Sequence, residues 1–133
     1  MIILDTSFIV SYFNTRDQNH PKAVKLMKKI HEPLCMTDYI FGEVVTVSLI
    51  RLKSLDRTSK IGEMLLKSLK MIDVEKTSFD NAWNLFCKQK ETILSFTDCT
   101  TVSVMQENDI EKIATFDEDF GKINGIEVID TRF

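Results

Sequence analysis

Short apolar runs rich in β-branched residues alternate along this chain with longer segments whose apolar residues recur at helical spacing. The runs predicted to form strands are residues 1–4, 34–36, 71–74, 112–116 and 126–129. The segments predicted to form helices are residues 7–13, 21–30, 38–53, 56–69, 77–86 and 97–108, with a single turn at 117–122. Strands that alternate with helices, without hairpin signals between them, form βαβ units and a parallel sheet. We therefore expect a three-layer α/β/α domain around a parallel sheet of four or five strands.

Capping residues mark the expected starts of several helices. Thr37 or Asp38 is expected to cap the helix that follows it, and Asp56 is expected to cap the next one. Residues 77–80, Thr-Ser-Phe-Asp, have the spacing of a capping box. The aromatic residues behind this box, Trp83 and phenylalanines at helical spacing, are expected to lie in the core rather than to stack on nucleic-acid bases.

The composition is that of one ordinary globular domain. The 133 residues are 44% hydrophobic and 28% charged, which excludes wholesale disorder. Four Gly and two Pro argue against a turn-dense all-β fold. No apolar run approaches the roughly 20 residues that a membrane span needs, and the three cysteines, odd in number and without a C-x-x-C pair, are typical of reduced thiols. We expect a single domain over residues 1–133, located in the cytoplasm and away from membranes.

Charge is divided unevenly along the chain. The net charge of −3 and the pI of about 5.4 disfavour a nucleic-acid partner. Residues 16–70, however, hold eleven Lys and Arg against six Asp and Glu, whereas residues 71–133 hold six against thirteen. A basic half and an acidic half suit a polyanion and a metal respectively, although helix faces that segregated by chance would give the same counts.

Carboxylates stand where two of the predicted strands end. Asp5 closes the first apolar run, and Asp117, with Asp119 two residues on, follows the run 112–116. The carboxyl ends of parallel strands meet at one edge of a sheet, where ligands bind, so we expect these side chains to lie at the same edge. The simpler interpretation of each acid alone is an N-cap.

Two further acids lie on predicted helices. Glu43 falls among apolar residues on the helical wheel, and an unpaired buried carboxylate costs several kcal/mol. It must therefore face solvent, pair with a base such as Arg51, or bind a metal. Asp98 opens the segment 97–108, where the helix dipole favours an acid. Each acid has an ordinary structural explanation, but four or five acids that converge on one sheet edge repel one another unless cations neutralise them.

With these acids in place, the sequence resembles a known family. The matching pieces are Leu4-Asp-Thr-Ser7, Glu43 ahead of an apolar helix, Thr97-Asp98 followed by small residues, and the closing Thr115-Phe-Asp-Glu-Asp-Phe120. In this order, and over nearly the whole length, they resemble a PIN-domain ribonuclease, and within that family the VapC toxins of toxin–antitoxin pairs. Gly42 stands where the family often has Asn, Cys99 where Ala is usual, and Asn108-Asp109 where a Gly turn is common. None of these departures removes a carboxylate.

The resemblance implies a Mg²⁺- or Mn²⁺-dependent endoribonuclease that hydrolyses RNA phosphodiester bonds. The catalytic acids that it implies, all of them around the metal, are Asp5, Glu43, Asp98 and Asp117. Asp5 and Asp98 would be the main metal ligands, and Asp119 a more distant ligand or a ligand of a second metal. Hard oxygen ligands suit these metals, and the absence of clustered His or Cys argues against zinc. Ser7 and Thr115 are interpreted as hydroxyls that orient the carboxylates, or else as ordinary capping and strand residues.

Basic side chains are candidates for positioning the phosphates of RNA. These residues are Lys22, Lys25, Lys28, Lys29 and Arg51. Such contacts fix the position of a nucleic acid without reading its sequence, and a solvated helix face is the simpler explanation of the lysines. His20 and His31 lie eleven residues apart, do not form a ligand pair, and are expected at the surface.

The predicted helix 38–53 is apolar almost all round, which is more hydrophobic surface than one small core needs. Exposed patches of this kind usually mark a partner, so we expect a homodimer formed through the helices of residues 43–69. The resemblance also implies a small antitoxin protein laid across the active-site face. Two other functions stay open: an RNA-processing PIN nuclease without an antitoxin, and a non-catalytic PIN-fold module that binds protein. Aspartyl-phosphate chemistry at Asp5 is disfavoured because no second acid stands beside it.

Overall fold

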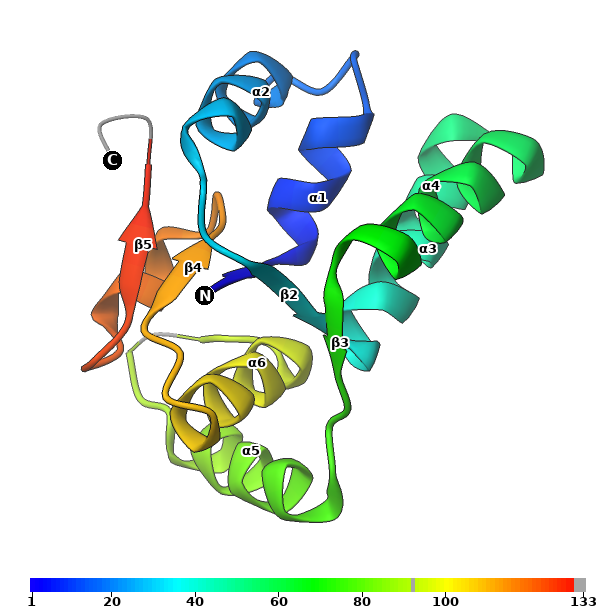
Figure 1. The fold of residues 1–133 in the computed structure, drawn as a ribbon. Coiled ribbons are helices and arrows are strands. Elements are labelled where there is room, and N and C mark those ends of the chain that lie inside the picture. The colour runs from blue at the N-terminus through cyan, green and yellow to red at the C-terminus, as the bar shows by residue number, and fades with distance from the viewer. Residues whose placement is uncertain (92, 131–133) are drawn as a thin grey trace.

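The computed structural model describes residues 1–91 and 93–130, and in this part of the chain a five-stranded sheet lies between layers of helices (Figure 1). The strands are β1 (Ile2–Leu4), β2 (Leu34–Thr37), β3 (Lys70–Ile72), β4 (Lys112–Ala114) and β5 (Glu127–Ile129). The helices are α1 (Thr6–Phe13), α2 (His20–Lys29), α3 (Asp38–Leu52), α4 (Leu55–Ser68), α5 (Lys76–Lys88) and α6 (Phe96–Glu107), with a short 3₁₀ helix, η1 (Glu118–Lys122). The predicted three-layer α/β/α architecture is confirmed.

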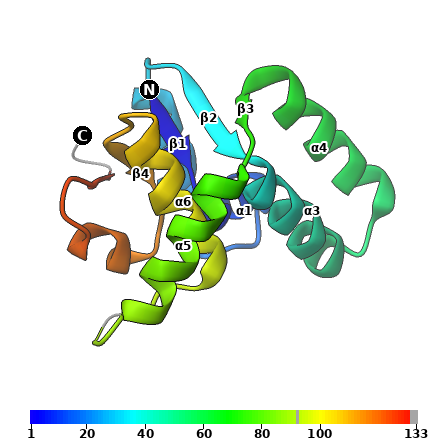
Figure 2. The same cartoon turned by 90° about the horizontal axis from the view of Figure 1, so that it is seen from below.

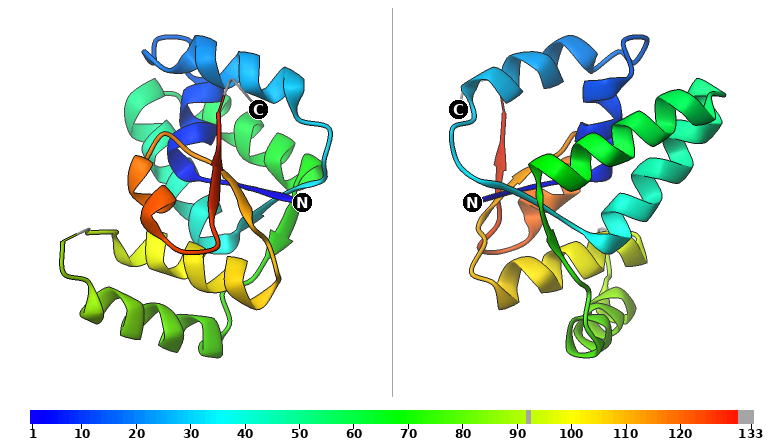
Figure 3. Two further views of the ribbon diagram at one scale, coloured as in Figure 1. Left: turned by 90° about the vertical axis from the view of Figure 1, so that its left-hand side faces the viewer. Right: turned by 45° about the vertical axis from the view of Figure 1, so that its right-hand side comes forward.

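All neighbouring strands are parallel, and their order is β3-β2-β1-β4-β5, so the first strand is the central one. Ile2 pairs with Leu34 on one side and with Lys112 on the other. Helices α1 and α2 cover one face of the sheet and α5 and α6 the other (Figure 3), while the α3–α4 hairpin extends from the side of the sheet (Figure 2). Strands covered on both faces need no polar face, which explains the uninterrupted apolar run of β1. None of the described helices is long and apolar enough to cross a bilayer.

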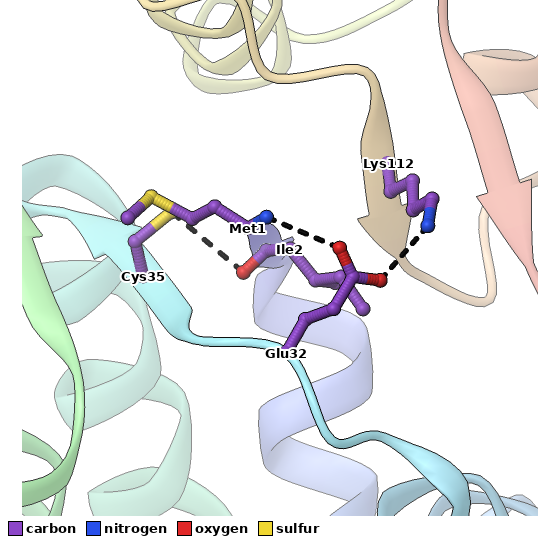
Figure 4. Close-up of polar contacts among 5 residues, drawn as sticks. All are labelled: Met1, Ile2, Glu32, Cys35 and Lys112. Atoms are coloured by element: carbon purple, nitrogen blue, oxygen red, sulfur yellow. Dashed lines mark hydrogen bonds and ion pairs between the residues drawn. The ribbon is translucent and has the colours of Figure 1, made fainter.

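Side chains join the amino ends of the strands. Glu32 accepts hydrogen bonds from Lys112 Nζ at 2.8 Å and from the Met1 ammonium at 3.2 Å (Figure 4). The hydrogen bond with Lys112 lowers the pKa of Glu32, and the same bond raises the pKa of Lys112. Nearby, the Cys35 thiol donates to the Ile2 carbonyl at 3.7 Å. At this edge of the sheet, Glu32 therefore links the amino ends of β1 and β4 through ion pairs.

The structure corrects two of the predicted helix starts. Of the two caps predicted for α3, Thr37 is the one that forms, and Asp38 lies in the first turn. Helix α4, however, is capped by Ser54, and Asp56 lies inside its first turn. The capping box predicted at the start of α5 is not formed, since Asp80 pairs instead with Lys76 at 2.8 Å. In α4 a nearby serine takes the place of the predicted cap, and in α5 a nearby lysine takes the acid of the predicted capping box.

The aromatic face of α5 packs differently from the expectation. The residues that this helix buries are the small Ser78 and Ala82, which allow close packing on α6. Trp83 consequently lies at the margin of that interface and is 54% exposed. The prediction that Trp83 belongs to the core is wrong, and so is the same prediction for Phe79, which is 38% exposed. The Trp83 ring stacks on Phe86 at a centroid distance of 5.7 Å.

The histidines and cysteines take ordinary structural places. His31 is exposed, as predicted, but His20 is half-buried, with its ring Nδ1 at 2.9 Å from the Ser11 carbonyl. Cys35 and Cys99 are buried free thiols, and burial raises the pKa of each to about 11. Cys87 is also a free thiol, but it is exposed, so the prediction of buried reduced cysteines holds for two of the three.

Candidate active site at the carboxyl ends of the strands

A cleft of about 420 Å³ opens at the edge of the sheet where the central strands end. Five acidic side chains line it. Asp17 lies in the loop after α1, and the other four are Asp5 after β1, Glu43 on α3, Asp98 on α6 and Asp117 after β4. Parallel topology places the carboxyl ends of the strands at one edge, and with them the turns that carry Asp5 and Asp117. The structure therefore brings together the four acids that the sequence singled out as catalytic.

Asp5 is the most deeply buried of these acids, with 5% of its surface exposed. Its Oδ2 accepts hydrogen bonds from the Thr115 hydroxyl at 2.7 Å and from the Ser7 hydroxyl at 3.1 Å. Burial raises the pKa of Asp5 from 3.8 to about 6; the bond from Thr115 opposes this rise, and the negative charge of Asp98 adds to it. A carboxylate that is this costly to ionise gains strongly from a nearby cation.

The two hydroxyls beside Asp5 also fix the loop that carries Asp117. Ser7 Oγ accepts the N–H of Phe116 at 3.0 Å, and Thr115 Oγ1 accepts the N–H of Asp117 at 3.0 Å. Each hydroxyl therefore links the Asp5 carboxylate to the backbone after β4. Ser7 and Thr115 thus contact the Asp5 carboxylate, and their role in orienting it stays a prediction.

Asp98 is held by the first turn of α6. Ser95 Oγ accepts the N–H of Asp98 at 3.1 Å, and Asp98 Oδ2 accepts the N–H of Ser95 at 3.0 Å, which completes a capping box. Burial raises the pKa of Asp98; the hydrogen bonds with Ser95 lower it, and the charges of Asp117 and Glu43 raise it further. Ser95 also lines the cleft. Ser95 was not predicted to belong to the site, although its spacing to Asp98 is that of a capping box.

Glu43 and Asp119 differ in their relation to the cleft. Glu43 is half-buried on α3 and lines the cleft, as expected. Asp119 is not among the described residues that line it, and its carboxylate pairs with Lys122 at 2.9 Å. Asp119 nevertheless contacts the site through its backbone, because its N–H donates to Asp117 Oδ1 at 2.9 Å.

The basic residues predicted to position RNA fall into two groups. Arg51 lines the acid cleft, and the partner that it contacts is Asp17 rather than Glu43, so the pairing suggested for Glu43 is wrong. The lysines of α2 are exposed and are not among the described lining residues of the cleft: Lys22, Lys25, Lys28 and Lys29. Lys22 lines a neighbouring pocket of about 330 Å³, which shares Phe116 with the cleft. Asp17 was not predicted, since a single acid in a loop carries no periodic signal.

The donor set of the cleft fits a hard divalent cation that keeps much of its water. Carboxylate oxygens are the ligands that Mg²⁺ and Mn²⁺ prefer, and mutual repulsion adds to the raised pKa values of Asp5 and Asp98. In residues 1–91 and 93–130, no three His, Cys, Asp or Glu side chains are close enough together to make a complete metal site. Mg²⁺ is commonly held by one or two carboxylates, with waters and substrate phosphates completing its coordination. A pair of carboxylates is therefore enough for it.

Known proteins resemble this chain over most of its length. Residues 2–126 match the family model of the PIN domain. The chain is 27% identical over 131 residues to the 23S rRNA-specific endonuclease VapC20 of Mycobacterium tuberculosis, covering 96% of this chain and 98% of that protein. The crystal structure of VapC20 from that bacterium, a sarcin-ricin loop cleaving toxin, matches with a TM-score of 0.85 at 24% identity, over 92% and 94% of the two chains.

Solved toxin–antitoxin complexes share the fold as well. VapBC2 from Rickettsia felis, bound to a DNA fragment from its promoter, matches with a TM-score of 0.72 at 17% identity, over 97% and 98% of the two chains. A toxin–antitoxin complex from Klebsiella pneumoniae matches with a TM-score of 0.73 at 19% identity, over 98% of each chain. The family match spans all five acids that line the cleft. The chain therefore belongs to the PIN domain family.

Proposed function

We propose that this chain is a Mg²⁺- or Mn²⁺-dependent endoribonuclease and the toxin of a VapBC-type toxin–antitoxin pair. The observation that carries the proposal is a cleft lined by the carboxylates of Asp5, Glu43, Asp98 and Asp117, of which Asp5 and Asp98 have raised pKa values. Acids arranged in this way favour a divalent cation. Full-length similarity to an endonuclease that acts on 23S rRNA supports the choice of RNA as substrate.

In this proposal the four acids have unequal roles. Asp5 and Asp98 are the main ligands of the metal, and Glu43 and Asp117 complete the acidic pocket around it. Asp119 acts from further away, through its backbone bond to Asp117. A metal bound there would activate a water and stabilise the leaving oxygen of the phosphodiester.

The other residues of the site hold these acids in place. Ser7 and Thr115 fix the orientation of Asp5 through the bonds to its Oδ2. The capping box with Ser95 fixes Asp98 at the start of α6. Outside the cleft, the exposed lysines of α2 contact RNA phosphates without reading the sequence. They are Lys22, Lys25, Lys28 and Lys29.

Cleavage of a labelled single-stranded RNA and of ribosomes that contain 23S rRNA tests the activity. We expect cleavage in Mg²⁺, none in EDTA, and a loss of at least ~10²-fold in the Asp5→Asn and Asp98→Asn variants, by analogy with the removal of one transition-state stabiliser. Asp80→Asn, which makes the same chemical change on the exposed face of α5, is the matched control and should cleave normally. Cleavage that survives both EDTA and Asp5→Asn would come from a contaminant and would refute the metal mechanism. If neither RNA is cut and Mg²⁺ does not raise the melting temperature, the protein is a non-catalytic binding module.

The proposed partners are a second copy of the chain and an antitoxin. Five large apolar side chains on α3 and α4 are exposed by 43% to 71%: Leu49, Ile50, Leu55, Met64 and Leu66. A patch of this kind supports dimerisation through these two helices. Solved toxin–antitoxin complexes with the same fold support an antitoxin that covers the active-site face.

The proposed location of the protein is the cytoplasm. Expression in cells tests the proposed antitoxin, and light scattering tests the proposed homodimer. We expect the chain alone to arrest growth and co-expression of the small protein encoded directly upstream to relieve the arrest. Arrest without such a neighbour would favour an RNA-processing nuclease. Light scattering that shows a monomer at micromolar concentration would contradict the homodimer. A single cooperative unfolding transition is expected if residues 1–133 form one domain.

A further inference from the structure

An ion pair spans the rim of the acid cleft. Arg51 Nη1, on the last turn of α3, donates to Asp17 Oδ2 at 3.4 Å, and the two residues lie 34 apart in the sequence. Both line the cleft. The Asp17 side chain is 15% exposed and the Arg51 side chain 52% exposed. The acid is therefore set into the protein, while the guanidinium extends from it toward solvent.

Asp17 is fixed by its own loop, between α1 and α2. Its Oδ1 accepts the N–H of Asn19 at 2.8 Å. Its backbone N–H donates to the Asn14 carbonyl, and its carbonyl accepts the N–H of His20, both at 3.0 Å. The contact between the His20 ring and the Ser11 carbonyl joins the same loop to α1. One carboxylate oxygen is thus held by the loop, and the other is left to hold Arg51.

The contact with Asp17 uses little of what a guanidinium offers. Arg51 presents five N–H donors in a planar fork that can bind a carboxylate or phosphate through two parallel bonds. Here one nitrogen makes one long bond. An exposed pair of this kind contributes little to stability. The helix dipole favours a base in the last turn of α3, but it does not explain why a fixed carboxylate from another loop meets that base.

Arg51 is also the single cation among the described residues that line the cleft. The acids that line it are Asp5, Asp17, Glu43, Asp98 and Asp117. A phosphodiester chain that enters this cleft meets repulsion from the acids, and a cation at the rim offsets it. Contacts to phosphate are also what fixes the position of a nucleic acid on a protein.

We propose that Arg51 binds a phosphate of the RNA strand next to the scissile bond, and that Asp17 is the positioning residue that holds its guanidinium at the rim. This proposal rests on the ribonuclease function proposed above, and it adds a residue that acts through Arg51 rather than on the RNA. The exposed donors of Arg51 receive the phosphate while the contact with Asp17 keeps the fork in place.

The proposal makes a prediction of unusual sign for Asp17. If Asp17 were merely one more negative charge in the cleft, its neutralisation would reduce repulsion and RNA would bind more tightly. If Asp17 positions Arg51, its neutralisation weakens RNA binding, and it does so only while Arg51 is present. The two explanations therefore predict opposite changes for the same substitution.

The test measures binding and cleavage separately. Binding of a fluorescein-labelled single-stranded RNA is followed by anisotropy over a series of KCl concentrations, in an Asp5→Asn background so that the RNA stays intact. The variants added to this background are Arg51→Gln, Asp17→Asn, their combination and Arg51→Lys. Asp80→Asn and Lys76→Gln are matched controls, because they remove the charges of an exposed ion pair on α5, away from the cleft.

We expect Arg51→Gln to weaken RNA binding about tenfold and to reduce the slope of log K against log salt by about 0.7, the value for one phosphate of a single strand. Asp17→Asn should weaken binding about threefold, and the combined variant should bind like Arg51→Gln alone. In the protein with native Asp5 and with Mg²⁺, both single variants should raise KM more than they lower kcat. The control pair should change neither quantity.

Several results would overturn the proposal. One is an Asp17→Asn variant that binds RNA as tightly as its parent or more tightly. Another is a loss of affinity on Asp17→Asn that is equally large whether position 51 is arginine or glutamine. If Asp17→Asn does not fold, Arg51→Lys still tests the planar guanidinium. This variant should bind RNA less tightly with the same slope of log K against log salt, because the charge is kept. Unchanged affinity would refute the role of the guanidinium. If Asp17→Asn weakens RNA binding only when Arg51 is present, but no cleavage depends on Asp5, the ribonuclease function is contradicted while the role of Asp17 and Arg51 in RNA binding stands. Absence of RNA binding by the native protein would end both proposals.

Discussion

Replacement of Asp5 by asparagine is expected to stabilise the metal-free protein while it abolishes cleavage. The asparagine keeps the size of the side chain and one oxygen that accepts the hydroxyls of Ser7 and Thr115. It removes the charge that burial and Asp98 make unfavourable. Stability and activity should therefore change in opposite directions, which a merely structural role for Asp5 would not produce.

The magnitude follows from the pKa of Asp5. A rise from 3.8 to about 6, at 1.36 kcal/mol per pKa unit, means that the ionised carboxylate costs the folded state about 3 kcal/mol. At roughly 3 °C per kcal/mol for a chain of this length, the melting temperature of Asp5→Asn should exceed that of the native protein by about 10 °C. This gap is an upper value, because the amide is also buried.

The gap depends on pH in a definite direction. Below about pH 4 the Asp5 carboxyl is protonated in both the folded and the unfolded protein, so its ionisation contributes nothing. Between pH 4 and 6 the unfolded chain releases the proton while the folded protein keeps it, and the stability of the native protein falls as the pH rises. Above pH 6 the cost is complete. Asp98 is present in both proteins, and its repulsion of the Asp5 carboxylate is already included in the raised pKa of Asp5.

Urea and thermal unfolding in EDTA at pH 4, 5, 6 and 8 measure the effect. Asp5→Asn and native protein should differ little at pH 4 and most at pH 8, and Mg²⁺ should narrow the gap because it binds the folded native site. Asp80→Asn, an exposed site on α5, should stay within about 0.5 kcal/mol of the native protein at every pH. An Asp5→Asn variant that is less stable than the native protein at pH 8, or a gap that does not change with pH, would refute this account of Asp5.

Three further predictions concern other parts of the molecule. Asp98→Asn should lose at least ~10²-fold in cleavage rate, whereas Asp119→Asn should lose less because Asp119 does not line the cleft; equal losses in a single-turnover assay would place both acids at the metal. Thr115→Val removes the hydroxyl that lowers the pKa of Asp5, so it should cost about 1–3 kcal/mol of stability and move the acidic limb of the pH–rate profile to higher pH. Ile50→Asp, on the exposed apolar patch, should weaken the dimer in light scattering without lowering the melting temperature of the monomer.

The sheet and the meeting of the acids could be predicted because both depend on regularities that the sequence carries directly. A strand covered on both faces gives an unbroken apolar run, as in residues 1–4. Once the strands are known to be parallel, the residues after β1 and β4 must lie at one edge, so the proximity of Asp5 and Asp117 needs no side-chain detail.

The errors arose where neighbouring residues competed or where the loops decided the contact. Ser54 and Asp56 are both good caps, and the backbone conformation that selects Ser54 is not encoded in residue type alone. The exposure of Trp83 depends on how closely α5 approaches α6 through its small residues. The contact of Asp17 with Arg51 joins an irregular loop to a helix 34 residues away, and no periodic pattern extends across that distance.

The hydroxyls beside Asp5 have a consequence for how this site should be mutated. Their hydrogen bonds have one polarity: the N–H groups of Phe116 and Asp117 donate to Ser7 and Thr115, and both hydroxyls donate to Asp5. The order cannot reverse, since an amide N–H cannot accept and a carboxylate has no hydrogen to give. Asp5 is thus the final acceptor of two chains of hydrogen bonds that begin at the backbone N–H groups of Phe116 and Asp117. Alanine at position 5 would remove this shared acceptor and leave the two hydroxyls with only each other, at 3.2 Å, so one of them would lose its acceptor. Because the same hydroxyls accept the N–H groups of Phe116 and Asp117, an alanine scan would assign part of the contribution of the Asp117 loop to Asp5.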